Sequence, residues 1–170
     1  MQIRAFLLSF ILLTGCTYIP DDIEPVKAFD INRFLGQWYE VARLDHSFES
    51  GLSNVTATYE MRKDQGINVV NRGFSADKEQ WSEAIGKAYF VDKTDVGHLK
   101  VSFWGPFYSS YVVFELGDNY DYAFVSGYNK DYLWLLSRTP QVDPSIMKKF
   151  LADAKKKGFD TSKLIMVEHS

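Results

Sequence analysis

The sequence predicts an all-β protein with one helix, in which eight antiparallel strands close into an up-and-down β-barrel and a C-terminal α-helix packs outside. Strand-like segments recur about every 10 to 15 residues from residue 38 onward, separated by turn-forming Gly, Asp and Asn. One amphipathic helical segment follows the eighth strand. Aromatic residues make up 16% of the chain, which suits both strands and apolar cavities. The length of 170 residues predicts a single domain.

The first residues have the pattern of an export signal rather than of a membrane-spanning helix. Arg4 precedes an apolar run from Ala5 to Leu13 that only Ser9 interrupts. As a helix this run would rise about 13 Å, well short of the roughly 30 Å hydrocarbon core of a bilayer. We therefore expect residues 1–15 to be a signal peptide that is removed.

The signal peptide ends in Leu13-Thr14-Gly15-Cys16, which resembles the lipobox of bacterial lipoproteins. Cys16 is the only cysteine, so no intramolecular disulfide can form. The resemblance implies that Cys16 becomes the first mature residue, an S-diacylglycerol cysteine with an acylated amine. It also implies an anchor in outer-membrane lipid, because Thr17 stands where an aspartate would indicate retention at the inner membrane. The alternative is an inert, buried thiol in an ordinary exported protein.

We expect residues 16–27 to form a lipidated tether and residues 28–170 to form the barrel domain. Pro20, Pro25 and the acidic pair Asp21-Asp22 favour an extended linker. Residues 29–35 predict one short helical turn, which Asp30 caps and whose Phe34 and Leu35 plug the end of the barrel.

The strand-like segments are bounded by stretches with turn chemistry. We place them at residues 38–46, 53–63, 66–75, 80–91, 98–104, 108–116, 121–128 and 131–138. Short connections make consecutive strands antiparallel neighbours. A sheet of about eight strands can close on itself, which removes its exposed edges and leaves room for one small ligand.

A helix follows at residues 144–157, and a short strand at 164–167 ends the chain. Asp143 is a suitable N-cap, Pro144 suits the first helical position, and Gly158 ends the helix. The side chains at helical spacing on one face are Ile146, Met147, Phe150, Leu151 and Ala154. The eighth strand is apolar on both faces, so we expect the lumen on one side of it and this helix on the other.

Three short motifs resemble the signatures of the lipocalin family. They are Gly36-x-Trp38-Tyr39 before the first strand, Tyr120-Asp121-Tyr122 entering the seventh, and Arg138 ending the eighth. The resemblance covers residues 28–168. It implies that Trp38 and Arg138 pack together at the closed end of the barrel, a cation–π contact worth about 1 kcal/mol or more. Gly36, Trp38 and Arg138 would then be structural residues that do not contact ligand.

Strand parity predicts which side chains face the lumen. Three small residues on one face of the fourth strand, Ala84, Gly86 and Ala88, leave space inside rather than fill it. The complete predicted lining is Ala57, Tyr59, Val69, Asn71, Ala84, Gly86, Ala88, Val101, Phe103, Tyr111, Val113, Tyr132 and Trp134. An apolar pocket with a few hydroxyl and amide groups suits an acyl chain with a polar head. The alternative is that these side chains pack a solid core.

The resemblance implies binding, storage or transport of lipophilic ligands, either fatty acids or lysophospholipids, by a lipid-anchored barrel facing the periplasm at the bacterial outer membrane. A second hypothesis is a structural or assembly role in the envelope, in which the exposed aromatic residues Trp104, Phe107 and Tyr108 form a partner surface or cap the lumen. Self-association stays open, so a homodimer is one alternative.

Other function classes find little support in the sequence. His46, His98 and His169 are scattered, and neither a Gly-x-Ser-x-Gly elbow nor an HxH or HExxH metal spacing is present. A lipid-modifying enzyme is therefore the weakest hypothesis, and we expect no catalytic residues, no metal and no cofactor. The chain has 19 Lys and Arg against 22 Asp and Glu, which argues against nucleic acid as a partner.

Overall fold

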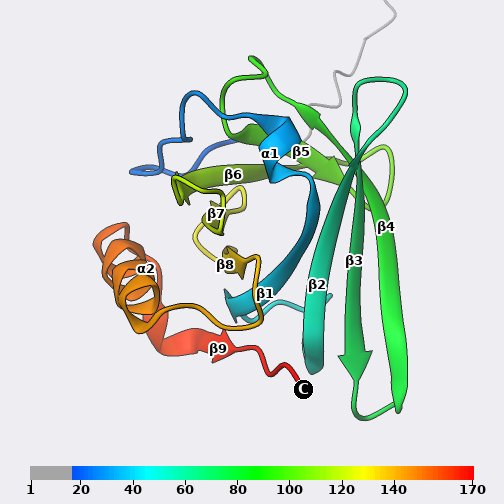
Figure 1. Cartoon of the computed structure of the whole chain (residues 1–170), viewed down its shortest axis with the longest axis vertical. Helices are drawn as coiled ribbons and strands as arrows, with labels where there is room; N and C mark the ends of the chain where they lie inside the picture. The colour runs from blue at the N-terminus through cyan, green and yellow to red at the C-terminus, as the bar shows by residue number, and fades with distance from the viewer. Residues whose placement is uncertain (1–16) are drawn as a thin grey trace, which may run out of the picture.

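The computed structural model describes residues 17–170 (Figure 1). The predicted signal peptide and the predicted lipidation site Cys16 lie outside the described residues. Within residues 17–170, no helix combines the length and apolar character that crossing a membrane requires.

Eight antiparallel strands form a closed barrel, as the sequence predicts. The strands are β1 Gly36–Leu44, β2 Leu52–Met61, β3 Ile67–Ser75, β4 Gln80–Phe90, β5 His98–Ser102, β6 Ser109–Leu116, β7 Tyr122–Ser126 and β8 Leu133–Ser137. Each pairs with its neighbour in the chain, and β8 pairs with β1. The barrel closes where β1 also pairs with β2, from Gly36 opposite Tyr59 to Tyr39 opposite Thr56.

A short helix and three side chains plug one end of the barrel. Helix α1, Ile31–Phe34, is capped by Asp30, whose side chain accepts a hydrogen bond from the backbone N–H of Asn32. Phe34 is buried, and its ring centroid lies 4.7 Å from that of Trp38. The Arg138 guanidinium carbon lies 3.9 Å from the centroid of the Trp38 ring on the other side of this cluster. We call this plugged end the closed end.

Arg138 also binds the backbone of the segments that meet at the closed end. Its guanidinium donates to the carbonyl oxygens of Arg33, Leu35 and Gln37 over 2.8 to 2.9 Å and to that of Tyr120 over 3.3 Å. One side chain thus ties α1 and the start of β1 to the turn between β6 and β7. Burial lowers the pKa of Arg138, which nevertheless stays charged at neutral pH.

The second helix, α2 Pro144–Lys156, covers the outside of the barrel (Figure 1). Phe150 and Ala154 are fully buried against Leu133 and Leu135, which point outward from β8. Leu151, expected on the same face, is instead 36% exposed because it lies at the edge of the contact. The turn η1, Thr161–Lys163, leads into β9, Leu164–Met166, which pairs with the end of β1.

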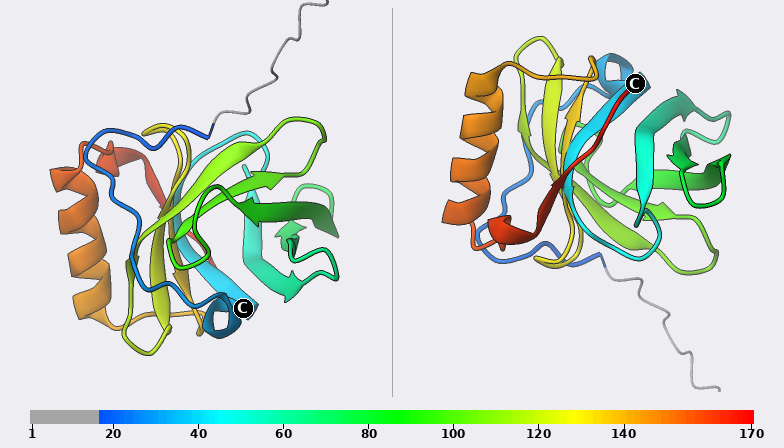
Figure 2. Two further views of the ribbon diagram at one scale, coloured as in Figure 1. Left: turned by 90° about the horizontal axis from the view of Figure 1, so that it is seen from above. Right: turned by 90° about the horizontal axis from the view of Figure 1, so that it is seen from below.

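The segment predicted as a tether, residues 16–27, packs along the barrel over much of its described part. Ile23 is buried against the barrel, and the backbone N–H of Val26 donates to the carbonyl of Val113 over 2.9 Å. The segment runs across the outside of the barrel to α1 at the closed end (Figure 2). Apolar side chains between the prolines drive this packing, whereas the prediction weighed only the prolines and acidic residues.

The closed end provides a direct test of the fold. Replacing Arg138 with Ala removes the stacking on Trp38 and leaves carbonyl oxygens from three segments without their donor. We expect a loss of about 2–4 kcal/mol in the free energy of unfolding, measured by urea denaturation. Arg138→Lys keeps the charge but not the forked donor geometry, so its loss should be intermediate. Arg62→Ala, which removes an exposed ion pair with Asp64, is the control and should unfold almost like the wild type.

Candidate ligand-binding cavity

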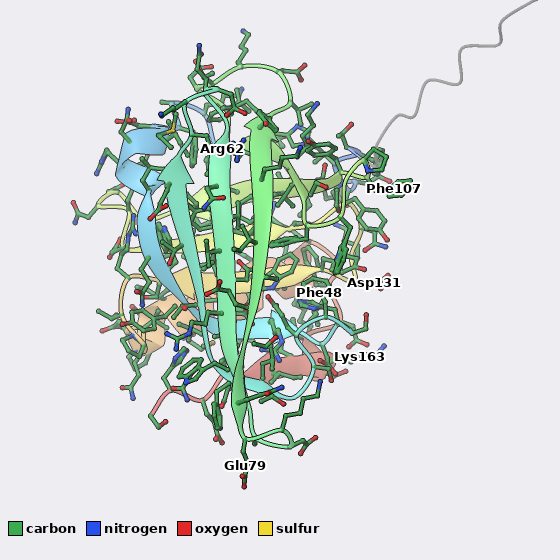
Figure 3. The ribbon with its side chains drawn as sticks, turned by 90° about the vertical axis from the view of Figure 1, so that its right-hand side faces the viewer. Phe48, Arg62, Glu79, Phe107, Asp131 and Lys163 are labelled. Atoms are coloured by element: carbon green, nitrogen blue, oxygen red, sulfur yellow. The ribbon has the colours of Figure 1, made fainter. Side chains whose placement is uncertain are left out.

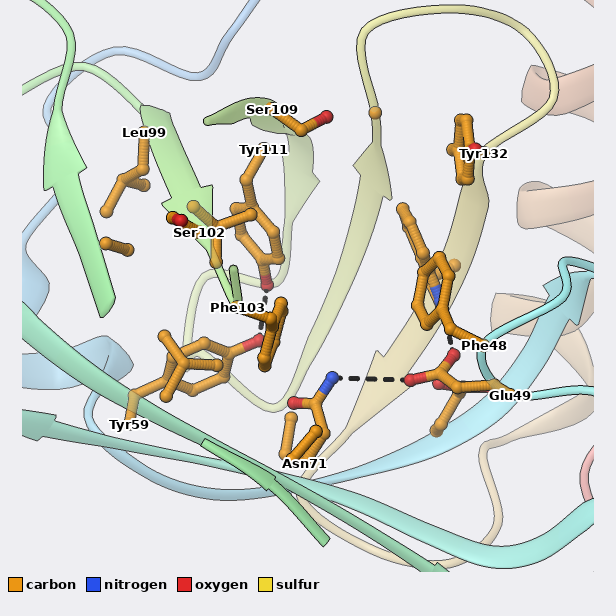
Figure 4. A pocket seen from close by; sticks show the side chains of 18 of the residues that line it. Phe48, Glu49, Tyr59, Asn71, Leu99, Ser102, Phe103, Ser109, Tyr111 and Tyr132 are labelled. Atoms are coloured by element: carbon orange, nitrogen blue, oxygen red, sulfur yellow. Dashed lines mark hydrogen bonds between the residues drawn. The ribbon is translucent and has the colours of Figure 1, made fainter. Parts of the chain in front are cut away.

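The barrel encloses a cavity of about 500 Å³ (Figure 4). Buried Phe34 of α1 lines one end of it and exposed Phe48, Trp104 and Phe107 line the other, so the cavity opens at the end opposite α1. Its walls are mostly apolar and come from seven of the eight barrel strands, all but β7, from three of the loops between them and from α1. Eleven of the thirteen residues predicted to face the lumen line it: Ala57, Tyr59, Val69, Asn71, Ala84, Ala88, Val101, Phe103, Tyr111, Tyr132 and Trp134. The interior is therefore hollow rather than a solid core.

Gly86 and Val113 are the two predicted lining residues that do not reach the cavity. A Cβ atom at Gly86 would lie 2.8 Å from Cδ1 of Phe103 and 2.9 Å from the carbonyl oxygen of Ser102. The small residue therefore admits the Phe103 ring instead of leaving empty space. Val113 is fully buried in the core below the cavity, near the segment at Val26.

Two tyrosine hydroxyl groups form a polar spot deep in the apolar wall. Tyr59 of β2 and Tyr111 of β6 share a hydrogen bond of 2.8 Å across the barrel (Figure 4). Burial raises the pKa of both phenols, so both stay neutral. Nearby, the hydroxyl of Ser102 also lines the cavity and has no hydrogen-bond partner in the protein.

A second polar cluster, which strand parity did not predict, lies at the side of the cavity. Glu49, from the loop between β1 and β2, accepts from the side-chain amide of Asn71 over 3.3 Å and from the indole N–H of Trp134 over 3.4 Å. Nε2 of His46 lies 3.1 Å from the same carboxylate. Burial pushes the pKa of Glu49 upward, but the contacts with His46 and Trp134 and the positive charge of Arg43 outweigh it and hold the pKa below its usual value. Glu49 is therefore a carboxylate at neutral pH.

Glu40 of β1 completes this cluster beneath Glu49. Arg43 donates to Oε1 of Glu40 over 2.9 Å and to the backbone carbonyl of Glu49 over 2.7 Å. Burial and the negative charge of Glu49 raise the pKa of Glu40 well above its usual range, and Arg43 offsets this only in part. The cluster thus fixes the loop between β1 and β2 against the barrel wall.

Aromatic side chains surround the opening of the cavity. Phe48, Trp104 and Phe107 are 57%, 84% and 68% exposed. They come from the loop between β1 and β2 and from the loop between β5 and β6, and all three also line the cavity. We call Phe48, Trp104 and Phe107 the rim.

The three histidines are not brought together. His46 stacks on Phe48 at the opening, with 3.9 Å between ring centroids. His98 lies toward the closed end and contacts Ser110, and His169 contacts the carbonyl of Glu40 from outside the barrel. Among residues 17–170, no three His, Cys, Asp or Glu side chains gather as a metal site would require.

A family model described as a lipocalin-like domain matches residues 29–169. The chain is a lipocalin. The family resemblance and the fold expected from three short motifs are thereby confirmed, since the match covers nearly all of the described chain.

Relatives of this lipocalin include bacterial lipoproteins of nearly the same length. It is 60% identical to the outer membrane lipoprotein Blc of Vibrio cholerae over 169 residues, 99% of each chain. It is 48% identical to the outer membrane lipoprotein Blc of Escherichia coli over 149 residues, which cover 88% of this chain and 84% of the relative. Among solved structures, insecticyanin from the tobacco hornworm superimposes with a TM-score of 0.70 at 21% identity, covering 90% of this chain and 87% of that one. The latter likeness concerns the fold alone.

The buried cluster makes stability depend on pH in a direction that can be tested. Because the pKa of Glu40 is raised in the folded state, folding favours its protonated form, and this contribution to stability is lost as pH rises above the usual range of glutamate. The free energy of unfolding of Glu40→Gln minus that of the wild type should therefore be larger at pH 8 than at pH 5. This difference should rise by at most about 1.4 kcal/mol per pH unit. Urea denaturation at several pH values measures this difference.

The control for that measurement is Glu60→Gln, since Glu60 is exposed at the end of β2. The free energy of unfolding of Glu60→Gln should differ from that of the wild type by the same amount at every pH. A Glu40→Gln difference that is equally flat would show that the buried carboxyl group is ionised like an exposed one.

Proposed function

We propose that this lipocalin binds the acyl chain of a fatty acid or lysophospholipid in its cavity and stores or transports it at the bacterial outer membrane. The observation that carries the proposal is the hollow, mostly apolar interior of about 500 Å³, open at one end. Apolar area removed from water contributes about 25 cal/mol per Å², so an acyl chain gains most of its binding energy from such walls.

The polar groups of the cavity fit a ligand with one polar end. The lower part has apolar walls with a single polar spot, the Tyr59 and Tyr111 hydroxyl pair. The upper part holds Glu49, Asn71 and the indole of Trp134 close to the opening. A lysophospholipid that enters tail first places its head group beside this upper cluster, whereas a fatty acid leaves the upper part to water.

The proposed location rests on the sequence around Cys16 and on the named relatives. Leu13-Thr14-Gly15-Cys16 resembles a lipobox, and the Vibrio cholerae and Escherichia coli relatives carry the name outer membrane lipoprotein. An acylated Cys16 would hold the barrel at the membrane through several chains, each buried CH₂ contributing about 0.8 kcal/mol. We propose binding rather than catalysis, because Glu40 and Glu49, the carboxyl groups that line the cavity within residues 17–170, are engaged in the cluster that fixes the loop.

A pair of substitutions on β4 tests the ligand site. Ala84 lines the cavity, and its neighbour Ile85 is exposed on the outside of the same strand. In the mature chain with Cys16→Ser, Ala84→Phe should weaken binding of stearoyl lysophospholipid roughly tenfold or more, because the ring occupies space that the acyl chain needs. Ile85→Phe adds a ring of the same size outside and should bind as the parent does. Tryptophan fluorescence titration measures both, and equal affinities would place the ligand outside the barrel.

The anchor has its own test in cells. The mature protein should show the mass of an acylated Cys16, and Cys16→Ser should move the protein from the membrane fraction to the soluble fraction. Thr17→Asp should keep the acyl mass but redirect the protein to the inner membrane. A membrane-bound Cys16→Ser protein with no acyl mass would contradict the lipid anchor.

A further inference from the structure

The exposed aromatic residues of the rim lie at the same end of the barrel as the start of the described chain. Phe48, Phe107 and Asp131 lie on one side of the molecule in Figure 3, away from Arg62 in the turn between β2 and β3. Lys130, in the loop between β7 and β8, donates to the backbone carbonyl of Asp21 over 2.6 Å. Residues 127, 128 and 132 of that loop line the cavity, so Asp21 is held beside the opening.

The chain between Cys16 and the packed segment is short. Pro20 is buried and Ile19 packs against the outer core, so the link consists of half-buried Thr17 and exposed Tyr18. Even fully extended, the steps from Cys16 to Ile19 span only about 10 Å at 3.3–3.6 Å per residue. The nine residues of β1 extend about 30 Å along the strand, or somewhat over 20 Å along the axis of a tilted barrel. An anchor on Cys16 therefore reaches the open end and not the closed end.

Building on the proposed anchor and ligand, we infer that the open end of the barrel faces the bilayer and that Phe48, Trp104 and Phe107 insert into its interface. These three aromatic side chains surround the opening and stay more than half exposed, even though Phe48 stacks on His46. Tryptophan and phenylalanine are favoured at the boundary of head groups and acyl chains. Since an anchor on Cys16 is joined by only about 10 Å of chain to Ile19, at the end of the barrel where this patch lies, the bilayer is its partner rather than a second copy of the chain.

This orientation deepens the proposed function. A cavity that opens onto the interface exchanges an acyl chain with the bilayer without exposing it to water, since the rim residues both line the cavity and contact lipid. The opening is extended on one side, because β5 pairs only with Lys87 to Phe90 of β4 and leaves residues 80–86 of β4 without a partner on that side. Lipid then has a lateral path beside the loop that carries Trp104 and Phe107.

The test uses the full-length acylated protein in phosphatidylethanolamine and phosphatidylglycerol vesicles whose acyl chains carry bromine, a quencher of tryptophan fluorescence. We expect strong quenching in the wild type and loss of half or more of it in Trp104→Phe. Trp81→Phe is the matched control, because Trp81 is also exposed but packs under Arg72 on the outside of the sheet. It should keep the quenching of the wild type.

Ala84→Phe separates this inference from the ligand proposal. A brominated chain inside the cavity quenches Trp134, which lines the wall, and that contribution disappears in Ala84→Phe while the contribution of Trp104 remains. Equal quenching of Trp104→Phe and wild type would overturn the orientation, even if Ala84→Phe shows that lipid enters the barrel. Shielding of Trp104 from both bromine and aqueous acrylamide, with a dimer in sedimentation, would also overturn it in favour of a second copy.

Discussion

The structure depends on one interaction: the guanidinium of Arg138, stacked on Trp38 and bonded to the backbone of three segments at one end of the barrel. A closed sheet of eight strands has two ends. Phe34, Trp38 and Arg138 fill one of them, so the other stays open. The floor of the hollow interior is fixed without a ligand, because Arg138 donates four hydrogen bonds to backbone carbonyl groups.

The apolar cavity is not uniform, and its polar groups have different purposes. The hydroxyl groups of Tyr59 and Tyr111 hydrogen-bond to each other, so their burial costs little free energy. The Glu40, Arg43 and Glu49 cluster is a buried charge network whose desolvation opposes stability, as the raised pKa of Glu40 shows. The cluster instead fixes positions: it holds the loop that carries Phe48 and brings the Glu49 carboxylate to the upper wall of the cavity. One loop therefore connects the polar part of the cavity with the rim.

Much of this molecule could be predicted from the residues, and the failures have definite physical causes. Strand alternation located most of the lining, because inward and outward faces follow from a period of two. For Gly86 it failed. Alternation predicts the direction in which a residue faces, but not which neighbour fills the space there, and at Gly86 that neighbour is the ring of Phe103. It missed Glu49 because that residue lies in a loop, where no period applies, and its burial depends on Asn71 and Trp134 from distant strands. The packing of the segment around Ile23 could not be predicted for a similar reason: proline and aspartate indicate an extended chain, but its contacts depend on the completed barrel.

Native mass spectrometry of the protein purified from its own envelope tests whether the cavity holds an acyl lipid. We expect a population of barrels that carries one noncovalent lipid with an acyl chain, in addition to the mass of the covalent anchor. A barrel that leaves the envelope empty, and still takes up no fatty acid or lysophospholipid on incubation with each, would show that the cavity is not a lipid site.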